Sequence, residues 1–414
     1  MNTRRLLILL LCLTMLFSLI ALSGCKREPS SILTGEGRKI DFSTLSDEET
    51  VAALGGELAS ELLRLSAEED GTENICLSPL SILTALAMAA NGASGQTLSE
   101  MEEVLGGLPI EKLNGILGAY LANVAEKDGL KVANSVWLRD TLNVNQSFPN
   151  VCADYYRAQI YKASFTTQTV EDVNRWVSEH TEGRIDRIIE AFNPDTVMLL
   201  INALSFEAEW KVPYDPDFDV TTKPFFGADG EKSLAEYMNS SEQFYIETEN
   251  ATGFIKDYRE GYSFVALLPE EGLSVGDYLN TLGETGLMDA VNAATERRVL
   301  VSLPKFSYDY EADLTDLLKK AGMPTAMDPL TADFGKMVTD DSQLFISRVI
   351  HKTDMTVDTK GPIAAAATAV AVDTYSAEIT PSDPLKVELN RPFVYLILDR
   401  SAGVPLFVGV VNQP

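Results

Sequence analysis

Two histidines limit the catalytic chemistry open to this chain of 414 residues. A Ser-His-Asp site needs a histidine as its base, and only His180 and His351 could supply one. His180 lies in RWVSEHTEGRID, the pattern of a polar helix end before Gly183, so we expect an exposed side chain. The sequence has no GxSxG elbow, HExxH or CxxC pair, or glycine-rich phosphate loop. We predict a protein that is not an enzyme and that uses no cofactor and no metal.

The N-terminus carries a targeting signal. Arg4 and Arg5 precede an apolar run from Leu6 to about Leu22, as in a secretory signal. The ending LSGC resembles a bacterial lipobox, which implies cleavage of the signal peptide, residues 1–24, and lipidation of Cys25; a transmembrane anchor is the alternative. Residues 25–42 would form a lipidated, flexible tether. We expect export across the cytoplasmic membrane and lipid anchoring at the cell surface or envelope.

The net charge and the cysteines argue against a nucleic-acid-binding protein and against a disulfide-rich protein. The net charge is −28, and loss of the signal would make it two units more negative, which argues against a nucleic-acid partner. After removal of Cys12 and lipidation of Cys25, two cysteines remain, too few for a disulfide framework. Cys76, within NICLSPL, is predicted to be a buried thiol, and one bridge to Cys152 stays open.

Hydrophobic periodicity predicts a single α+β domain over residues 43–414, without an internal linker or repeat. Apolar residues three and four apart predict helices in 47–69, 77–106, 170–183 and 314–323. Alternating or apolar runs predict strands in 129–140, 197–212, 263–272 and 297–310, and a C-terminal hairpin from 393–398 and 405–411. In 197–212, one face would carry Leu200, Asn202, Leu204, Phe206, Ala208 and Trp210.

The segment GPIAAAATAVAVDTYSAEITPSD, residues 361–383, fits neither period. It follows a predicted strand that ends near Thr359, in which His351, Thr353, Met355 and Val357 share one face. Alanine favours helix, but TAVAVDTY is β-branched and alternating. A connection this long in a compact domain is normally either functional or a sign that the domain has been misread.

Several segments together resemble the serpin family. They include HKTDMTVDTKGPIAAAATAVAV, NRPFVYLILDRSAGVPLFVGVVNQP, NICLSPLSILTALAMAANGASGQTLSEM, VMLLINALSFEAEWKVPYD and RRVLVSLPKFSYDYEADLTDLLKKAGM. The matches span nearly all of residues 45–414 in the family's order. The resemblance implies a multi-helix domain with a large mixed β-sheet, further β-sheets and an exposed reactive-centre loop at about 361–384.

The resemblance also implies a function and partners. The chain would be a suicide-substrate inhibitor of serine proteases, an endopeptidase inhibitor whose cleaved loop inserts into the main sheet and traps the protease covalently. We expect a monomer apart from that complex and the lipid anchor. The hinge that inserts would comprise Thr359, Lys360, Gly361, Pro362, Ile363, Ala364, Ala365, Ala366, Ala367 and Thr368. The small side chains suit a strand that must enter a packed interior.

The reactive bond is predicted between Tyr375 and Ser376, because in inhibitory members it usually falls about fourteen residues beyond the hinge glycine. Tyrosine before the bond implies a chymotrypsin-like or subtilisin-like target. The segment after Ser376 is longer than in many members, so Val372-Asp373 and Ala377-Glu378 remain alternatives.

Three hinge residues depart from the family's pattern. Pro362 stands where threonine or serine is usual, and Ile363 and Thr359 stand where glutamate is common. Proline lacks the N–H that a central strand donates, so Pro362 would slow insertion of the loop. A protease could then complete hydrolysis and leave. The alternative function is therefore a non-inhibitory serpin that acts as a protease substrate or a surface binding protein.

Five further residues match mechanical positions of the family. Ser78, Ser81, Asn202 and His351 correspond to a hydrogen-bonded cluster beneath the region where the sheet opens, and Trp210 to the tryptophan near the point of loop entry. A satisfied core network is the simpler interpretation of the polar residues and is compatible with this role. Trp210 would serve equally well as a core residue.

Overall fold

The computed structural model describes residue 40 and residues 47–69, 71–193, 196–283, 286–360 and 384–414. Its helices and short 3₁₀ turns are α2 Glu48–Glu69, α3 Pro79–Ala90, α4 Gly95–Val104, α5 Ile110–Val124, α6 Ser147–Tyr156, α7 Thr167–His180, η2 Arg259–Gly261, α8 Val275–Leu282, α9 Gly286–Asn292, α10 Thr315–Lys320, η3 Thr325–Met327 and η4 Gly335–Met337. Its strands are β1 Ile75–Leu77, β2 Leu130–Arg139, β3 Gln159–Ala163, β4 Met198–Phe206, β5 Val220–Phe226, β6 Lys232–Glu247, β7 Ala251–Asp257, β8 Tyr262–Pro269, β9 Thr295–Pro304, β10 Phe306–Asp313, β11 Ile350–Val357, β12 Leu385–Glu388, β13 Phe393–Asp399 and β14 Val404–Val411.

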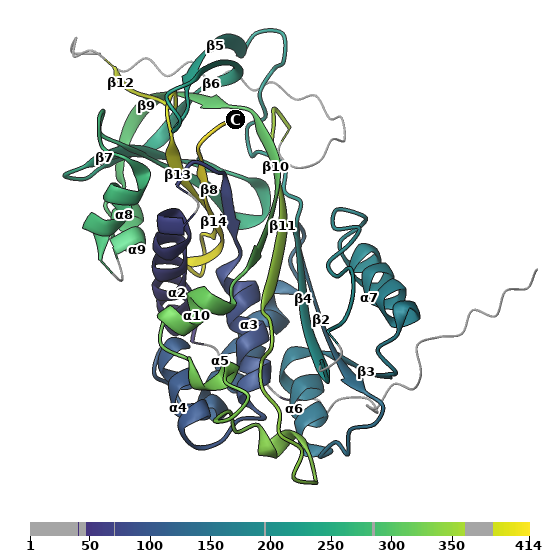
Figure 1. Ribbon diagram of the computed structural model, residues 1–414. Coiled ribbons are helices and arrows are strands. Elements are labelled where there is room, and N and C mark those ends of the chain that lie inside the picture. The colour runs from purple at the N-terminus through teal and green to yellow at the C-terminus, as the bar shows by residue number, and fades with distance from the viewer. Residues whose placement is uncertain (1–39, 41–46, 70, 194–195, 284–285, 361–383) are drawn as a thin grey trace, which may run out of the picture.

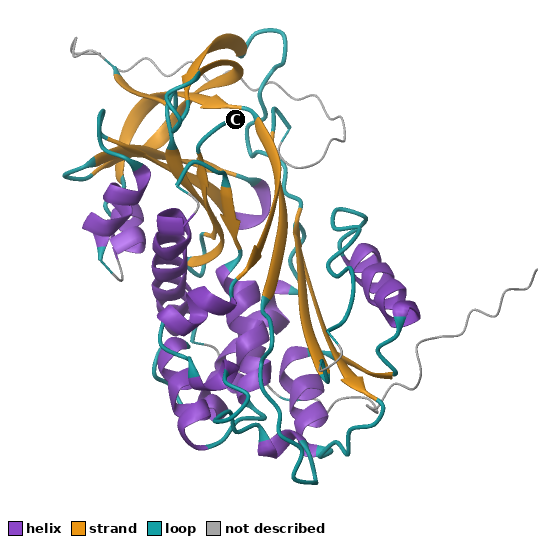
Figure 2. Ribbon diagram, in the orientation of Figure 1, coloured by secondary structure: helices purple, strands orange, loops and turns teal. Residues whose placement is uncertain are grey.

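The described strands form three sheets (Figures 1 and 2). A nine-stranded sheet has the order β1-β14-β13-β8-β7-β6-β9-β12, with β5 paired to β6. The other two sheets are β3-β2-β4 and the antiparallel pair β10-β11. The α+β architecture and the C-terminal hairpin expected from the sequence are confirmed, because β13 and β14 pair in antiparallel register.

Local sequence explains the elements that border the candidate site. Helix α3 begins after Ser78, whose hydroxyl accepts the Ser81 N–H, and Pro79 occupies its first turn. Strand β11 alternates between buried and partly buried residues, with His351, Thr353, Met355 and Val357 on the buried side as predicted.

Strand β4 lies between two apolar clusters. Ile201 and Ala203 pack with α7 residues on one face. On the other face Leu204 and Phe206 join the main core, and Asn202 meets Ser81 of α3. This confirms the face predicted from the alternation of residues 200–210.

Cys76 and Cys152 are free and fully buried, so they do not form the bridge that the sequence left open. Burial raises the pKa of the Cys76 thiol to about 11, which keeps it protonated and unreactive at neutral pH. Among the helices built from described residues, none has the length and apolar character needed to cross a bilayer.

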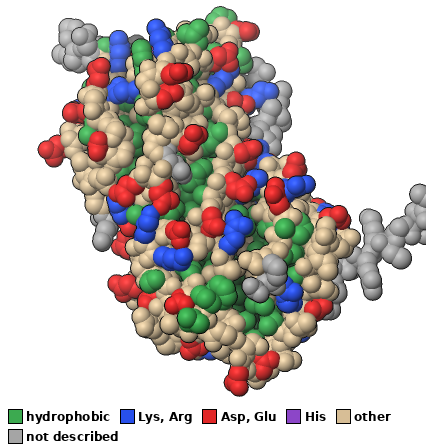
Figure 3. Space-filling model, viewed as in Figure 1, with side chains coloured by type: hydrophobic (Ala, Val, Ile, Leu, Met, Phe, Trp, Pro, Cys, Tyr) green, Lys and Arg blue, Asp and Glu red, His purple; other side chains and the backbone are tan. Residues whose placement is uncertain are grey.

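Basic side chains are interspersed with acidic ones on the face drawn in Figure 3. On that face the basic side chains of the described residues do not gather into one large patch.

Candidate functional site

The candidate site is an opening between β4 and β11. Within the described residues, β4 pairs only with β2, and β11 only with β10, so the edges of β4 and β11 that face each other carry no strand. Figure 1 shows the two strands running in the same general direction. Their C-terminal extensions meet at Trp210 and Lys360, while Met198 and Ile350 line one cavity at the opposite end. The strands are therefore parallel to each other.

This geometry defines what could fill the opening. A chain that leaves Lys360 and turns back would run antiparallel to both β4 and β11. It could then pair with two unpaired edges at once, which is the arrangement that a central strand needs. The opening is thus placed for the segment that directly follows β11.

We call the end of the opening near Trp210 and Lys360 its upper end, and the end near Met198 and Ile350 its lower end. The upper end is closed by a short connection after β4, residues 210–214, which we call the strap. The Trp210 N–H donates to the Lys360 carbonyl (3.2 Å), and the Tyr214 N–H donates to the Thr359 carbonyl (3.1 Å). The Trp210 indole N–H donates to the Asp358 carbonyl (2.8 Å). Trp210 is fully buried and stacks on Tyr258 with ring centroids 4.1 Å apart. These bonds hold the end of β11 to the strap at the point where a new strand would enter.

The lower end contains a cavity of about 240 Å³. Its walls come from α3, from β4, from residues 185–193 after α7 and from residues 345–352. Most of the lining is apolar, with Ile82, Leu86, Ile188, Phe192, Leu200 and Ile350. The cavity therefore lies between α3, β4 and the start of β11, at the end of the opening away from the strap.

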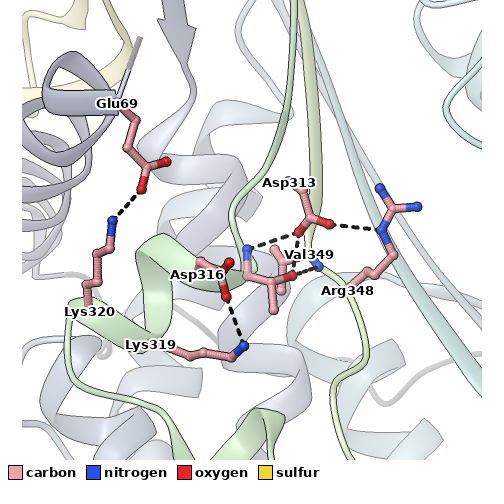
Figure 4. A network of polar contacts seen from close by, with 8 residues as sticks. Glu69, Asp313, Asp316, Lys319, Lys320, Arg348 and Val349 are labelled. Carbon is pink, nitrogen blue, oxygen red and sulfur yellow. Dashed lines mark hydrogen bonds and ion pairs between the residues drawn. The ribbon is translucent and has the colours of Figure 1, made fainter. Parts of the chain in front are cut away.

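A polar network fixes the chain at the lower border (Figure 4). Asp313, at the end of β10, accepts from the Arg348 Nε (2.9 Å) and from the Thr315 N–H (3.1 Å). The Val349 N–H in turn donates to the Thr315 hydroxyl (3.0 Å). Residues 348–349 are therefore attached to β10 and α10, on the side of the opening away from β4.

Four polar side chains that the sequence singled out are joined beneath the opening. The Ser78 N–H donates to the His351 Nε2 (3.1 Å). Ser81 connects to Ser78 by its N–H and to the Asn202 amide oxygen by its hydroxyl. The cluster thus links β11, α3 and β4, the three elements that border the opening.

Burial determines the ionisation of His351. The side chain is only 6% exposed, and desolvation lowers the pKa of its imidazole to about 4. At neutral pH the ring is therefore uncharged, and its Nε2 can accept the Ser78 N–H.

The comparisons with known proteins identify the family. The model described as "Serpin (serine protease inhibitor)" matches residues 54–414. This chain belongs to the serpin family. Human Serpin B8 is 28% identical over 376 residues, which are 87% of this chain and 98% of that protein. The crystal structure of the thermophilic serpin Tengpin in the native state shares 39% identity and a TM-score of 0.80, covering 92% of this chain and 96% of that one.

A third serpin bears on the range of functions in the family. Human thyroxine-binding globulin, solved in complex with its hormone, is 26% identical with a TM-score of 0.79, and covers 89% of this chain and 99% of its own. The serpin fold expected from the sequence is confirmed by the family match and these structures.

The structure places some predicted site residues and not others. Ser78, Ser81, Asn202, His351, Trp210, Thr359 and Lys360 all lie at the opening, as described above. The signal peptide, Cys25, most of the tether, and the loop from Gly361 to residue 383, which includes Pro362, Ala364, Ala366, Tyr375 and Ser376, lie outside the described residues. The bond alternatives after Val372 and Ala377 lie there too.

The expectation for His180 needs correction. Its ring is only partly exposed, because it stacks on Trp176 with centroids 4.1 Å apart and its Nδ1 meets the Trp176 carbonyl at 2.7 Å. Both partners lie one helical turn before it, a contact that a charge pattern alone does not reveal.

Sequence reasoning missed the continuation of the polar cluster in this serpin. The Asn202 amide donates to Asn134 (2.6 Å), and Asn134 donates to the Tyr156 carbonyl (2.7 Å). The Tyr156 hydroxyl donates to Asn114 (2.6 Å), which exchanges two hydrogen bonds with Asn91. An asparagine inside an apolar strand or helix was the available signal, because a buried amide needs partners.

An ion bridge also spans the opening. Arg184, in the connection after α7, pairs through Nε with Glu207 (3.0 Å) and through Nη1 with Asp354 (3.2 Å). Glu207 directly follows β4 and Asp354 lies on β11, so one guanidinium holds both borders. A strand that entered between them would break at least one of these contacts.

Proposed function

We propose that this serpin is a suicide-substrate inhibitor of serine proteases with chymotrypsin-like or subtilisin-like specificity. The observation that supports the proposal best is the opening between β4 and β11, with its two unpaired edges and its closure at the strap directly before residue 361. After cleavage, the arm that begins at Gly361 would be free to turn back into this opening. The inserted arm would carry the attached protease along and distort it.

The sequence of the arm agrees with the space available. Ala364, Ala366 and Thr368 would form one face of the inserted strand, and Ala365 and Ala367 the other. Small side chains suit the side toward α3, where Ser81 and Ile82 already lie close to β4. An arm from Gly361 to Tyr375 would span on the order of 50 Å when extended, enough to move a protease across the domain.

A second function is a serpin that binds a ligand or serves as a protease substrate without trapping the protease. Pro362 favours it, because proline donates no hydrogen bond to a neighbouring strand. Human thyroxine-binding globulin is a structural neighbour with a binding role. We prefer inhibition because Pro362 would lie at the start of the inserted strand, where proline is tolerated.

We also propose that the protein is a bacterial lipoprotein, exported by residues 1–24 and anchored outside the cytoplasmic membrane through Cys25. It would act there as a monomer, without nucleic acid and without catalytic activity of its own. Mass spectrometry of the purified full-length chain tests the anchor: a diacylglyceryl mass on Cys25 would support it, and an unmodified N-terminal peptide would refute it.

Covalent trapping can be tested directly with the chain from Lys26 onward. It is mixed with chymotrypsin and, separately, with subtilisin, and the products are separated on a denaturing gel. We expect a stable band at the summed mass of the two proteins less that of the released C-terminal peptide, which should begin with Ser376. Cleavage without any complex for either protease would favour the binding or substrate function instead.

A pair of hinge variants sharpens this experiment. Ala366→Arg and Ala367→Arg place the same large cation on opposite faces of the arm. Insertion requires one of them to point toward the packed side, so that variant should be cleaved at the wild-type rate but form little complex. Complex formation at the wild-type level by both variants would show that the arm does not enter between β4 and β11.

A further inference from the structure

A buried lysine lies beneath the strap. Lys256, on β7, is only 2% exposed, and its Nζ is 2.9 Å from Glu242 Oε1 on β6. The same Nζ donates to the Val212 carbonyl within the strap (3.3 Å). It also lies 5.3 Å from the ring centroid of Trp210 and 4.4 Å from that of Tyr214. One ammonium therefore contacts three of the five strap residues.

Glu242 extends the connection to the strap by a second route. Its Oε1 accepts the Ser240 hydroxyl (2.6 Å), and the Ser240 oxygen is 3.4 Å from the Tyr214 hydroxyl. The ion pair thus forms a closed network in which the nine-stranded sheet supplies the charges and the strap supplies a carbonyl, two rings and a hydroxyl.

Burial makes this arrangement informative. Removing an ammonium from water is costly unless it is paired and hydrogen-bonded. A methionine of similar length would fill the same volume, but it could neither donate to the Val212 carbonyl nor attract the two ring faces. The charge therefore adds directional attachment of the strap to the sheet, beyond filling space.

The strap in turn holds the end of β11. Trp210 and Tyr214 supply the backbone and indole donors that bind the carbonyls of residues 358–360. An entering strand must separate residues 358–360 from the strap, because those donors occupy its path. The contacts of Lys256 with Trp210 and Tyr214 should therefore raise the free energy needed to separate residues 358–360 from the strap.

We propose that Lys256, paired with Glu242, is a positioning residue that keeps the entry point of this serpin closed until the loop is cut. The role of Lys256 in holding the strap does not depend on the proposed inhibition; only its effect on inhibitory activity rests on that proposed function. If the chain is an inhibitor, loss of the pair should let uncleaved molecules convert spontaneously to an inserted, inactive form.

The test uses the double variant Lys256→Met/Glu242→Gln, which removes both charges and leaves neither one buried alone. Arg297→Met/Glu247→Gln is the matched control. Like Lys256 and Glu242, these two residues join β6 to a neighbouring strand, here β9, through an ion pair (2.6 Å), and the cation lies over the ring of Tyr245. Both charged side chains of the control pair, however, are well exposed. Hydrogen exchange of the Trp210 and Tyr214 amides is measured by mass spectrometry without any protease.

We expect the Lys256 double variant to exchange these two amides about tenfold faster, while the amides of β13 and β14 keep their wild-type rates. The control pair should leave all of them unchanged. Unchanged exchange at the strap would overturn the proposal, as would an equal acceleration in β13 and β14, which indicates global loss of stability.

The readout is independent of inhibition. A wild-type chain that never traps a protease would refute the proposed function, yet the local exchange result would still support or refute the role of Lys256. If trapping occurs, the double variant incubated at 37 °C should lose complex-forming capacity several-fold faster than the control.

Discussion

The pH dependence of stability should depend on His351. The folded protein holds this imidazole uncharged, because burial lowers the pKa from 6.5 to about 4. The unfolded chain binds a proton near its ordinary pKa of about 6.5. Between these two values the unfolded state carries more protons, so the free energy of unfolding must fall as the pH falls.

The size of the effect follows from the shift. Each pKa unit corresponds to about 1.4 kcal/mol, so the full penalty is about 3 kcal/mol at a pH of about 4. Between pH values of about 7 and about 5, the expected loss is about 2 kcal/mol. The stability that His351 contributes is therefore complete above about pH 6.5 and is lost in the window between 6.5 and 4.

The assay is urea unfolding of the wild type and of His351→Gln at both pH values. The glutamine oxygen can still accept the Ser78 N–H but cannot take up a proton, so the variant should lose about 2 kcal/mol less on acidification. His180→Gln is the matched control, because it removes the other histidine and leaves His351 in place. An identical pH dependence in the wild type and His351→Gln would refute the reasoning.

Three other predictions concern Pro362 in the hinge, Arg184 in the ion bridge and Tyr156 in the continuation of the polar cluster. Pro362→Thr should raise the ratio of trapped to cleaved product about threefold, measured by gel densitometry with chymotrypsin; a lower ratio would contradict the assigned role of the proline. Arg184→Met should speed the spontaneous loss of complex-forming capacity on incubation, because β11 loses its contact at Asp354; an unchanged rate would mean that the ion bridge does not resist opening. Tyr156→Phe should lower the free energy of unfolding by about 1 kcal/mol, because it removes one of the two donors to the Asn114 amide oxygen and leaves only Asn91; urea titration measures this, and no change would mean that the Asn91 donor alone satisfies that oxygen.

Strand character near the site could be predicted from the sequence because its cause is local. In β11 the period of two places His351, Thr353, Met355 and Val357 toward the core, and the structure has them buried. The same argument predicted the face of β4 that carries Asn202. The buried face of each strand follows from two local properties alone: the alternation of side chains along a pleated strand and the positions of the apolar residues.

The partners of those residues could not be predicted in the same way. The bond between Asn202 and Asn134 requires the antiparallel register of β4 on β2, which pairs these two residues directly. The bond between Tyr156 and Asn114 joins two helices 42 positions apart in the chain. Both depend on tertiary placement, for which the sequence offers no local period.

Lys256 shows the same limit for charge. In GFIKDY a lysine beside an aspartate is typical of an exposed strand position. The residue is buried only because the strap folds over β7 and brings Trp210 and Tyr214 onto its ammonium. A pattern of charges along one strand contains no information about a segment that arrives from elsewhere.

In the proposed mechanism the cut loop enters between β4 and β11 and joins the sheets to which they belong. The most direct test of this insertion is hydrogen exchange of the chain before and after cleavage in the loop, followed by mass spectrometry of peptides from both strands. Insertion predicts that amides of β4 and β11 that now face the opening become strongly protected, since each edge gains a hydrogen-bonded neighbour. Unchanged exchange in both strands of the cleaved chain would show that the loop does not insert between them.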